Sequence, residues 1–539
     1  MTTRRSFIAA GGAAMLGLAG APAVLARRAA FDLVLRGGTI FDGTGSGEMA
    51  ADVGITGGRI VEIGPTLGRG SEEIDVRGLA VAPGFVDIHS HADGTLDEDP
   101  RAESAIRQGI TTIIAGQDGG SRATGAEDDG FADYFARLDA LRPGVNVASM
   151  VGLGSVRGAV VGDDDRPATP AELARMTALV ERALEDGACG ASSGLEYTPG
   201  AFASREELMA LCRPLAARGL VYSTHMRNED DRLLDSIEES IAVARGAGCG
   251  LQISHLKTQG PRNWGKLDDA FAQVEAAQHE GLDIAFDRYP YLAYSTGLTN
   301  LFPVWSRDGG TEAFLARLDD PSTAPRIRSE TLAKVELIGG WDNAQITSVR
   351  ADADRAAEGK RLGGYAESLG ADPYETAVGL LRRSEGRVGM VGFAMSEENL
   401  ERILAHPLGM VCTDGGGFAV DGPTRRGSPH PRGIGTCARV LGRYVRERKA
   451  LTLPAAVRKM SALPASRARL GDRGLLARGQ AADVVVFDPA AVEDRATFEM
   501  PFAYPAGITA VIVNGAVALR EGERSRTGAG QVLRPGGRS

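Results

Sequence analysis

The 539-residue chain is poor in cysteine. It has five, an odd number, and no two of them form a Cys-x-x-Cys pair. They are Cys189, Cys212, Cys249, Cys412 and Cys437. A free buried cysteine behaves as a small apolar residue, and we interpret most of them in that way. A disulfide framework is therefore not expected.

Positive charge is also lacking. The formal net charge is −10 and the sequence pI is about 5.4. Proteins that bind nucleic acids carry a basic surface, so no nucleic-acid partner is expected. The apolar share of 43% is ordinary for a soluble globular protein.

Long apolar runs are absent after a weakly apolar stretch at the N-terminus. Thr3-Arg4-Arg5-Ser6-Phe7-Ile8 leads into an Ala/Gly-rich stretch that ends at Leu25. This order resembles a twin-arginine export signal. We assign residues 1–27 to the signal, with cleavage after Ala26. The mature protein is expected in a bacterial periplasm, without a stable membrane anchor.

Histidine is scarce as well, with seven in the chain, yet two lie close together. Gly84-Phe85-Val86-Asp87-Ile88-His89-Ser90-His91 is an apolar run that ends in both. If residues 85–91 form a strand, the side chains of His89 and His91 share one face. Two neutral imidazoles on one wall suit a divalent metal, usually zinc. His-x-His alone is weak evidence, so the remaining ligands must come from elsewhere.

Four later apolar runs also end in potential ligands, namely Asp118, His225, His255 and Asp414. Helix-like stretches precede two of them, at residues 204–218 and 233–247. Alternating helices and buried strands indicate a parallel sheet. Ligands at the carboxyl ends of several strands predict an α/β fold of the (β/α)8 barrel type, with the site on that face.

Three further motifs make the pattern specific. They are Ser192-Ser193-Gly194-Leu195-Glu196-Tyr197-Thr198-Pro199-Gly200, Asp287-Arg288-Tyr289-Pro290-Tyr291 and His430-Pro431-Arg432-Gly433-Ile434-Gly435-Thr436. Together with the ligand runs, they resemble the amidohydrolase superfamily, and more closely its N-acyl-D-amino-acid deacylase (D-aminoacylase) family. The resemblance covers about residues 32–522.

The resemblance implies a site for one or two Zn²⁺ ions. The implied metal ligands are His89, His91, Asp118, His225, His255 and Asp414. Asp414 is also the implied catalytic residue. Asp118 stands where the family commonly has a metal-binding cysteine, and a carboxylate can also ligate or bridge zinc. Leu153 stands where the family often has a histidine.

The resemblance also implies that the substrate α-carboxylate is held by Lys257, Tyr289, Ser295 and Arg432. An arginine fork binds a carboxylate through two hydrogen bonds, and lysine or tyrosine adds another. We interpret His430 as structural, and we expect His279 and His406 at the surface.

The implied activity is zinc-dependent hydrolysis of the amide bond of N-acyl-D-amino acids, giving a D-amino acid and a carboxylate. Asp414 would act first as base and then as acid. The preference for D substrates rests on the resemblance alone. Two alternatives stay open: a related enzyme acting on a D-containing dipeptide or a cyclic amide, and a non-catalytic periplasmic binding protein of the same fold. The expected partner is a small molecule.

The two ends of the mature chain each carry a few short strands separated by turns. Neither set can bury a core alone, so we expect residues 28–83 and 466–539 to form one small β-sandwich. The barrel is assigned to residues 84–465. A long insertion at about 301–385 interrupts it late and is expected to overhang the catalytic face. Two roles stay open for it, a lid over the site and a purely structural excursion.

The export signal predicts two N-termini. Protein recovered from the periplasm should begin near Arg27, and protein retained in the cytoplasm should keep Arg4 and Arg5. N-terminal sequencing of the two fractions measures this. Recovery of full-length protein from the cytoplasm alone would contradict export.

Overall fold

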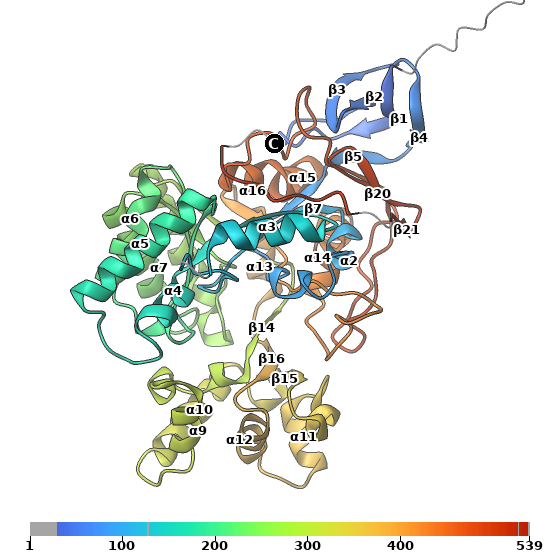
Figure 1. Cartoon of the computed structure of the whole chain (residues 1–539). Helices are drawn as coiled ribbons and strands as arrows, with labels where there is room; N and C mark the ends of the chain where they lie inside the picture. Colours follow the sequence, from blue (N-terminus) through green and yellow to red (C-terminus); the bar gives the residue numbers. More distant parts are fainter. Residues whose placement is uncertain (1–29, 127–128, 526–527, 537–539) are drawn as a thin grey trace, which may run out of the picture.

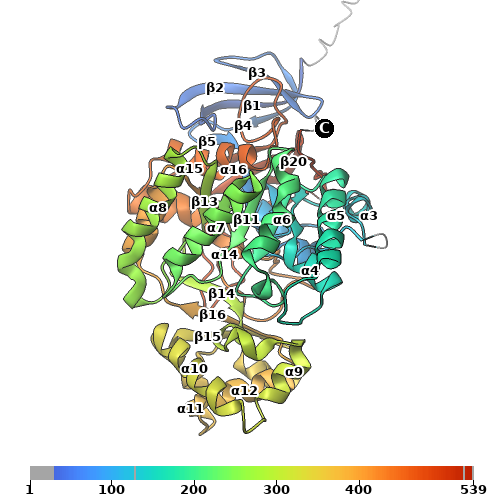
Figure 2. The ribbon, with the colours of Figure 1, turned by 90° about the vertical axis from the view of Figure 1, so that its left-hand side faces the viewer.

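The structure is a computed structural model that describes residues 30–126, 129–525 and 528–536. The predicted signal at residues 1–27 lies outside the described residues. Three parts follow one another along the molecule (Figures 1 and 2): a β-sheet region, a central barrel wrapped in helices, and a small lobe on the opposite side of the barrel. No helix in the described ranges is long and apolar enough to cross a membrane.

The centre is a ring of eight parallel strands. Their order is β6 (Phe85–Asp87), β7 (Ile110–Ala115), β8 (Asn146–Ser149) continued by β9 (Val151–Gly152), β10 (Gly190–Gly194), β11 (Val221–His225), β12 (Gly250–Ile253), β13 (Ile284–Arg288) and β17 (Gly409–Val411). Each pairs in parallel with the next. A parallel bridge between Ser90 and Gly415 closes the ring. The predicted (β/α)8 fold is confirmed.

Amphipathic helices cover the outside of the ring, as Figure 2 shows for α6–α8. The main ones are α3 (Phe131–Leu141), α5 (Pro170–Asp186), α6 (Arg205–Ala216), α7 (Leu233–Ala247), α8 (Leu267–His279), α13 (Glu397–Ala405) and α14 (Arg432–Arg439). Local sequence fixes their ends. Helix α5, for example, begins with a capping box between Thr169 and Glu172 and ends at Gly187, whose φ is 113°.

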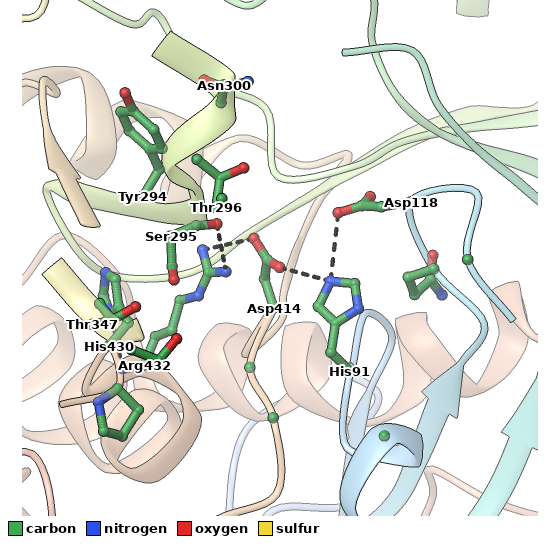
Figure 3. A pocket seen from close by; sticks show the side chains of 18 of the residues that line it. His91, Asp118, Tyr294, Ser295, Thr296, Asn300, Thr347, Asp414, His430 and Arg432 are labelled. Carbon is green, nitrogen blue, oxygen red and sulfur yellow. Dashed lines mark hydrogen bonds and ion pairs between the residues drawn. The ribbon is translucent and has the colours of Figure 1, made fainter. Parts of the chain in front are cut away.

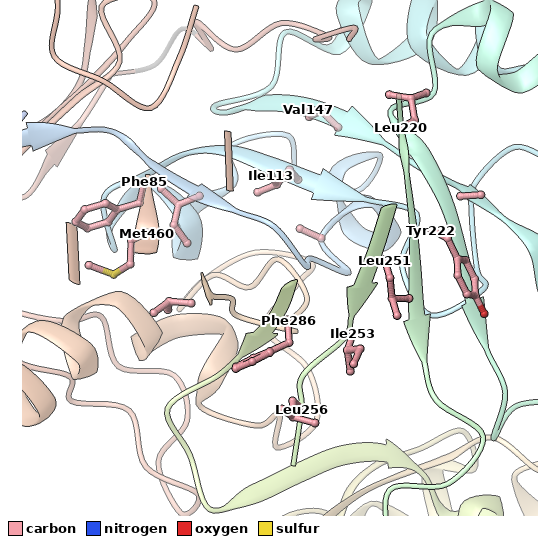
Figure 4. Close-up of a cluster of buried hydrophobic side chains, with 14 of the residues drawn as sticks. Phe85, Ile113, Val147, Leu220, Tyr222, Leu251, Ile253, Leu256, Phe286 and Met460 are labelled. Carbon is pink, nitrogen blue, oxygen red and sulfur yellow. The ribbon is translucent and has the colours of Figure 1, made fainter. Parts of the chain in front are cut away.

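The main hydrophobic core lies between the strands and these helices (Figure 4). Ile113, Leu251 and Phe286 come from three strands, and Leu211 and Val274 from two helices; each is at most 1% exposed. Burial of such side chains is the largest favourable term in folding. The core therefore fixes the strand ends on which the site stands.

A buried carboxylate holds the last strand against the first. Asp87, at the end of β6, accepts hydrogen bonds from the Thr413 backbone amide at 2.8 Å and from its hydroxyl at 2.5 Å. The His89 carbonyl accepts from the Asp414 amide at 2.9 Å. The closure of the ring thus lies directly beneath the predicted metal ligands.

The two chain ends share one nine-stranded sheet, in which β18 (Val484–Phe487) pairs antiparallel with β5 (Ala80–Pro83). The other strands are β1 (Phe31–Ile40), β2 (Met49–Thr56), β3 (Arg59–Gly64), β4 (Gly70–Asp75), β19 (Ile508–Val513), β20 (Ala516–Arg520) and β21 (Glu523–Arg524). Side chains from both ends, such as Val53 and Val486, fill one core. Neither end could bury this core alone.

Two C-terminal segments leave this sheet, although residues 466–539 were expected to belong to it. Residues 488–507, between β18 and β19, extend to the mouth of the central cavity, which residues 499–502 line. Val532 bridges in parallel to Val147 of β8. The C-terminal part therefore also packs on the barrel.

The insertion forms the small lobe and is wider than the expected 301–385. Its frame is a three-stranded antiparallel sheet of β14 (Ala293–Gly297), β15 (Ala344–Val349) and β16 (Val388–Phe393). Four helices cover it: α9 (Gly310–Arg317), α10 (Ala324–Leu337), α11 (Leu362–Ser368) and α12 (Pro373–Arg383). The first and last strands of the frame along the chain, β14 and β16, move its bounds to residues 293–393. We call this segment the lobe.

The expectation for His406 was wrong, whereas His279 is exposed as expected. His406 is 9% exposed and packs on Phe271, with ring centroids 4.5 Å apart. Its Nε2 lies 3.1 Å from Glu275 Oε1. All five cysteines lie in the described residues, where each is free and buried.

Replacing Thr413 by valine should destabilise the ring closure. The loss of the hydroxyl leaves one oxygen of buried Asp87 without its partner, which costs about 1–3 kcal/mol. Thermal unfolding should shift to lower temperature, while Thr413→Ser, which keeps the hydroxyl, should unfold close to wild type. Equal unfolding temperatures for Thr413→Val and Thr413→Ser would contradict this role.

Candidate metal centre and active site

A cavity of about 1670 Å³ opens at the carboxyl ends of the barrel strands. Nine of the ten predicted site residues line it: His91, Asp118, His225, His255, Lys257, Tyr289, Ser295, Asp414 and Arg432. The tenth, His89, lies behind them and is fully buried. Leu153, at the start of a short helix, is buried in the main core.

The first group of donors consists of His89, His91, Asp118 and Asp414. Asp118 Oδ2 lies 3.4 Å from His89 Nε2 and 3.5 Å from His91 Nε2. Asp414 Oδ1 lies 3.6 and 3.2 Å from the same two nitrogens. Figure 3 shows His91 between the two carboxylates. Tetrahedral zinc with bonds of about 2.0–2.2 Å holds its ligand atoms about 3.3–3.6 Å apart, so this group has the dimensions of a zinc site.

The second group shares one oxygen with the first. Asp118 Oδ2 also lies 3.4 Å from His255 Nε2 and 3.8 Å from His225 Nδ1. The two imidazole nitrogens are 3.0 Å apart. Three protein ligands leave a fourth position open, which is typical of catalytic zinc sites. Asp118 is therefore placed to bridge two metal positions.

Buried polar atoms near these groups support metal binding. Both ring nitrogens of His89 and Oδ1 of Asp118 are buried and make no well-aligned hydrogen bond in the described structure, although each nitrogen faces a carboxylate oxygen at 3.4 Å. Such atoms are rare unless an ion or water meets them. Imidazole and carboxylate donors suit zinc, so the residues present fit the implied metal.

The predicted strand at residues 85–91 is shorter than expected. Strand β6 ends at Asp87, so His89 and His91 lie in the segment that follows. Their rings still meet at Asp118 and Asp414, because Ser90 between them bridges to Gly415 and fixes the segment.

Three of the predicted ligands adopt a left-handed backbone conformation. The φ angles are 52° at Asp118, 36° at His255 and 48° at Asp414. Non-glycine residues seldom adopt such angles, which cost about 1–3 kcal/mol each and cluster at functional sites. Each lies just beyond its strand, where the turn directs the side chain into the cavity.

A carboxylate stands behind each of three ligand histidines. Asp287 Oδ1 lies 3.4 Å from His89 Nδ1, Glu196 Oε2 lies 3.4 Å from His225 Nε2, and Glu229 Oε1 lies 3.0 Å from His255 Nδ1. Such carboxylates orient metal-binding histidines. The sequence alone did not predict these roles for any of the three. For Asp287 a signal was present, since it is a carboxylate near the end of a barrel strand.

The ammonium group of Lys257 is already paired. Its Nζ lies 2.5 Å from Glu229 Oε2 and 2.7 Å from His255 Nδ1. The side chain is 2% exposed. Lys257 therefore lies at the predicted site, in contact with Glu229, the carboxylate behind His255.

Arg432 is placed beside the predicted base. Its Nη1 lies 2.8 Å from Asp414 Oδ2, and its Nη2 is 3.5 Å from the Ser295 carbonyl (Figure 3). The guanidinium lies 4.5 Å from the ring centroid of Tyr289. Tyr289 has a buried hydroxyl with no partner among the residues described. His430 Nδ1 accepts from the Arg432 amide at 3.0 Å, which fits a structural role.

The charges in this cluster shift its pKa values strongly. Burial alone would raise the pKa of Asp414, but the charges of Arg432 and His89 outweigh burial and hold it well below its usual range. For His91 burial acts in the opposite direction and would lower the pKa, but hydrogen bonds and charge from Asp118 and Asp414 raise it to about 9. For His225 the charge of Glu229 and its other carboxylate neighbours outweigh burial, and the pKa rises to about 10.

A buried two-position site for a divalent metal, with a carboxylate base at the mouth of a (β/α)8 barrel, defines a metal-dependent hydrolase. The chain belongs to the amidohydrolase family. The family profile matches residues 72–300 and 418–519, and the gap between the two matches contains most of the lobe.

Characterised relatives cover nearly the whole chain. The N-acyl-D-glutamate deacylase of Alcaligenes xylosoxydans xylosoxydans is 37% identical over 93% of this chain and 96% of its own. The D-aminoacylase of the same organism is 36% identical over 93% and 97%. A crystal structure of N-acyl-D-glutamate deacylase from Bordetella bronchiseptica, complexed with zinc and a phosphonate that mimics the tetrahedral intermediate, is 36% identical, with a TM-score of 0.80 over 94% of this chain and 99% of that one.

Zinc binding to the metal-free protein should strengthen with pH. With pKa values of about 9 and 10, His91 and His225 are protonated at neutral pH, and zinc must displace those protons. Affinity should rise between about pH 6 and 9, by about tenfold per pH unit for each proton released. Calorimetry in buffers of different ionisation enthalpy counts the protons, and binding at pH 7 without proton release would refute the assignment.

Proposed function

We propose that this protein is a zinc-dependent amidohydrolase that cleaves the amide bond of N-acyl-D-amino acids, releasing a D-amino acid and a carboxylate. One observation carries the proposal: Asp414 contacts the donor group of His89 and His91 on one side and Arg432 on the other. A base, a metal position and a cation for a substrate anion therefore meet in one cavity.

The residues divide the chemistry between them. His89, His91, Asp118 and Asp414 would hold one zinc ion, and Asp118, His225 and His255 a second. When bound, zinc lowers the pKa of a coordinated water and polarises the scissile carbonyl. Asp118 Oδ2 belongs to both donor groups, since it lies 3.4 Å from His89 Nε2 and 3.4 Å from His255 Nε2. The two zinc positions would therefore lie side by side in the cavity.

Asp414 moves the proton. Its low pKa keeps the carboxylate ionised at neutral pH, so it can accept a proton from the attacking water as the carbonyl carbon is attacked. It then delivers this proton to the leaving nitrogen, whose bond to the carbonyl carbon breaks. Arg432 keeps the carboxylate in place through the 2.8 Å ion pair.

The substrate α-carboxylate is assigned to the wall formed by Arg432, Tyr289 and Ser295. The Tyr289 hydroxyl is the unpaired donor on this wall, and a guanidinium adds charge-assisted hydrogen bonds. Lys257 also lines the cavity, but its pairing with Glu229 favours a role behind His255. Fixing the α-carboxylate orients the amide for attack.

The choice of D substrates rests on three relatives that match most of the chain and are named N-acyl-D-glutamate deacylase, D-aminoacylase and N-acyl-D-aspartate deacylase. They differ in side chain, including glutamate and aspartate, so the proposal names no side-chain class.

We further propose that the enzyme acts in the periplasm. The paired Arg4 and Arg5 before an Ala/Gly-rich stretch support this proposal.

The zinc-loaded protein should release amino acid from N-acetyl-D-amino acids and not from the L enantiomers. Asp414→Asn should retain zinc at the Asp118–His225–His255 group but lose about 10²–10⁴-fold in kcat, the usual contribution of a positioned acid–base group. Amino-acid release and zinc content are measured on the same samples. Near-normal turnover by Asp414→Asn would end the assignment of the base.

Two further outcomes separate the alternatives. The carboxamide of the best substrate, which lacks the α-carboxylate, should be a poor substrate. Equal turnover of the acid and the carboxamide would favour a cyclic or neutral amide as substrate. A protein that binds zinc but hydrolyses none of the N-acetyl amino acids would favour another amide as substrate. A protein that binds no zinc would favour a binding function.

A further inference from the structure

Glu196 connects the metal site to the lobe. It follows β10 in the motif that begins at Ser192 and is 7% exposed. Its carboxylate lies between His225, a predicted zinc ligand, and side chains of the lobe.

The contact with His225 fixes the orientation of the imidazole. Glu196 Oε2 lies 3.4 Å from His225 Nε2, at the long end for a hydrogen bond. The other nitrogen, Nδ1, faces His255 and Asp118. A carboxylate at Nε2 favours the tautomer with its proton there, which leaves the Nδ1 lone pair for a metal. The Tyr197 ring, 4.7 Å away between centroids, packs against the same imidazole.

The lobe holds Glu196 from the other side. Asn300 Nδ2 donates to Glu196 Oε2 at 2.9 Å, and Arg307 Nη2 donates to the Glu196 carbonyl at 3.0 Å. Lys334 Nζ, from α10, lies 4.0 Å from Glu196 Oε1 and 2.5 Å from Asp230 Oδ2. All three donors lie between β14 and β15, so the position of Glu196 depends on how the lobe packs on the barrel.

Glu196, His225 and Glu229 lie close enough together to suggest another metal position. The structure argues against it. Glu229 Oε2 is 2.5 Å from Lys257 Nζ, and an ammonium group there occupies the place of a metal cation. The pair Glu196–His225 therefore supports the zinc ligands from behind.

We propose that Glu196 is a positioning residue for His225, and that through it the packing of the lobe sets the zinc affinity of the Asp118–His225–His255 position. This inference rests on the proposed role of those three residues as zinc ligands. The lobe would then influence the metal centre as well as line the cavity.

Two variants test the proposal from opposite sides of the contact. Glu196→Gln removes the carboxylate nearest to His225 Nε2 and leaves Glu229, whose Oε2 is 3.9 Å from the same nitrogen. Asn300→Ala removes the lobe's hydrogen bond while Glu196 keeps its charge. Loss of a partner behind a metal ligand costs about 10- to 100-fold in metal affinity. We expect a loss in that range for Glu196→Gln and about tenfold for Asn300→Ala, at one of the two zinc positions only.

Arg328→Gln is the matched control. Arg328 also lies on α10, but it pairs with Asp372 and Glu375 within the lobe. Each metal-free protein is titrated with zinc against a chromogenic chelator, and the cobalt-substituted forms are compared by visible absorption. Thermal unfolding of the metal-free forms reports on folding separately. The control should keep both zinc affinities and the wild-type cobalt spectrum.

The outcomes separate this proposal from the proposed function. Unchanged zinc affinity in both Glu196→Gln and Asn300→Ala would overturn the positioning role while leaving the zinc enzyme intact. Equal weakening at both positions, shared by Arg328→Gln, would indicate general destabilisation and would also overturn it. Wild-type protein that binds no zinc would instead remove the proposed function.

Discussion

The structure depends on one oxygen atom, Oδ2 of Asp118, which lies within 3.8 Å of a nitrogen of each of four histidines. Histidines buried this closely repel one another when protonated and lack partners when neutral. The carboxylate offsets the repulsion in the first case, and a bound metal would provide the partner in the second. The histidines come from the ends of three strands, so the whole ring must close correctly for this oxygen to meet them.

A layer of opposite charges surrounds that centre. Asp414 pairs with Arg432, Glu229 with Lys257, and Asp230 with Lys334. Buried charges are tolerated when they are paired and hydrogen-bonded, and removing one partner leaves the other at high cost. Two of these cations, Arg432 and Lys334, lie on helices beyond the strand ends that carry the ligands. The metal centre is therefore held both by the barrel and by the elements stacked on it.

The sequence predicted the parts of this arrangement that are local to strand ends. A short apolar run followed by His, Asp or Glu marks a ligand because the side chain leaves the strand at the cavity. The roles of Glu196 and Glu229 could not be predicted from the sequence, because they arise only when separate loops meet. His406 was misplaced because Phe271 and Phe286, which cover it, belong to other elements. The mouth segment at residues 499–502 was missed because its position depends on the sheet joining both chain ends, a contact between segments about 400 residues apart.

The left-handed backbone at Asp118, His255 and Asp414 also limits how this site can evolve. Apart from glycine, asparagine, aspartate and histidine are the residues most enriched in this conformation, because short polar side chains can bond locally to the backbone. A β-branched or bulky replacement would meet steric resistance before its chemistry mattered. The residues with the lowest conformational penalty at these three turns therefore include aspartate and histidine, which are potential metal ligands. The backbone conformation at these three positions therefore favours residues that can bind a metal, whereas other positions in the cavity can change with less conformational constraint.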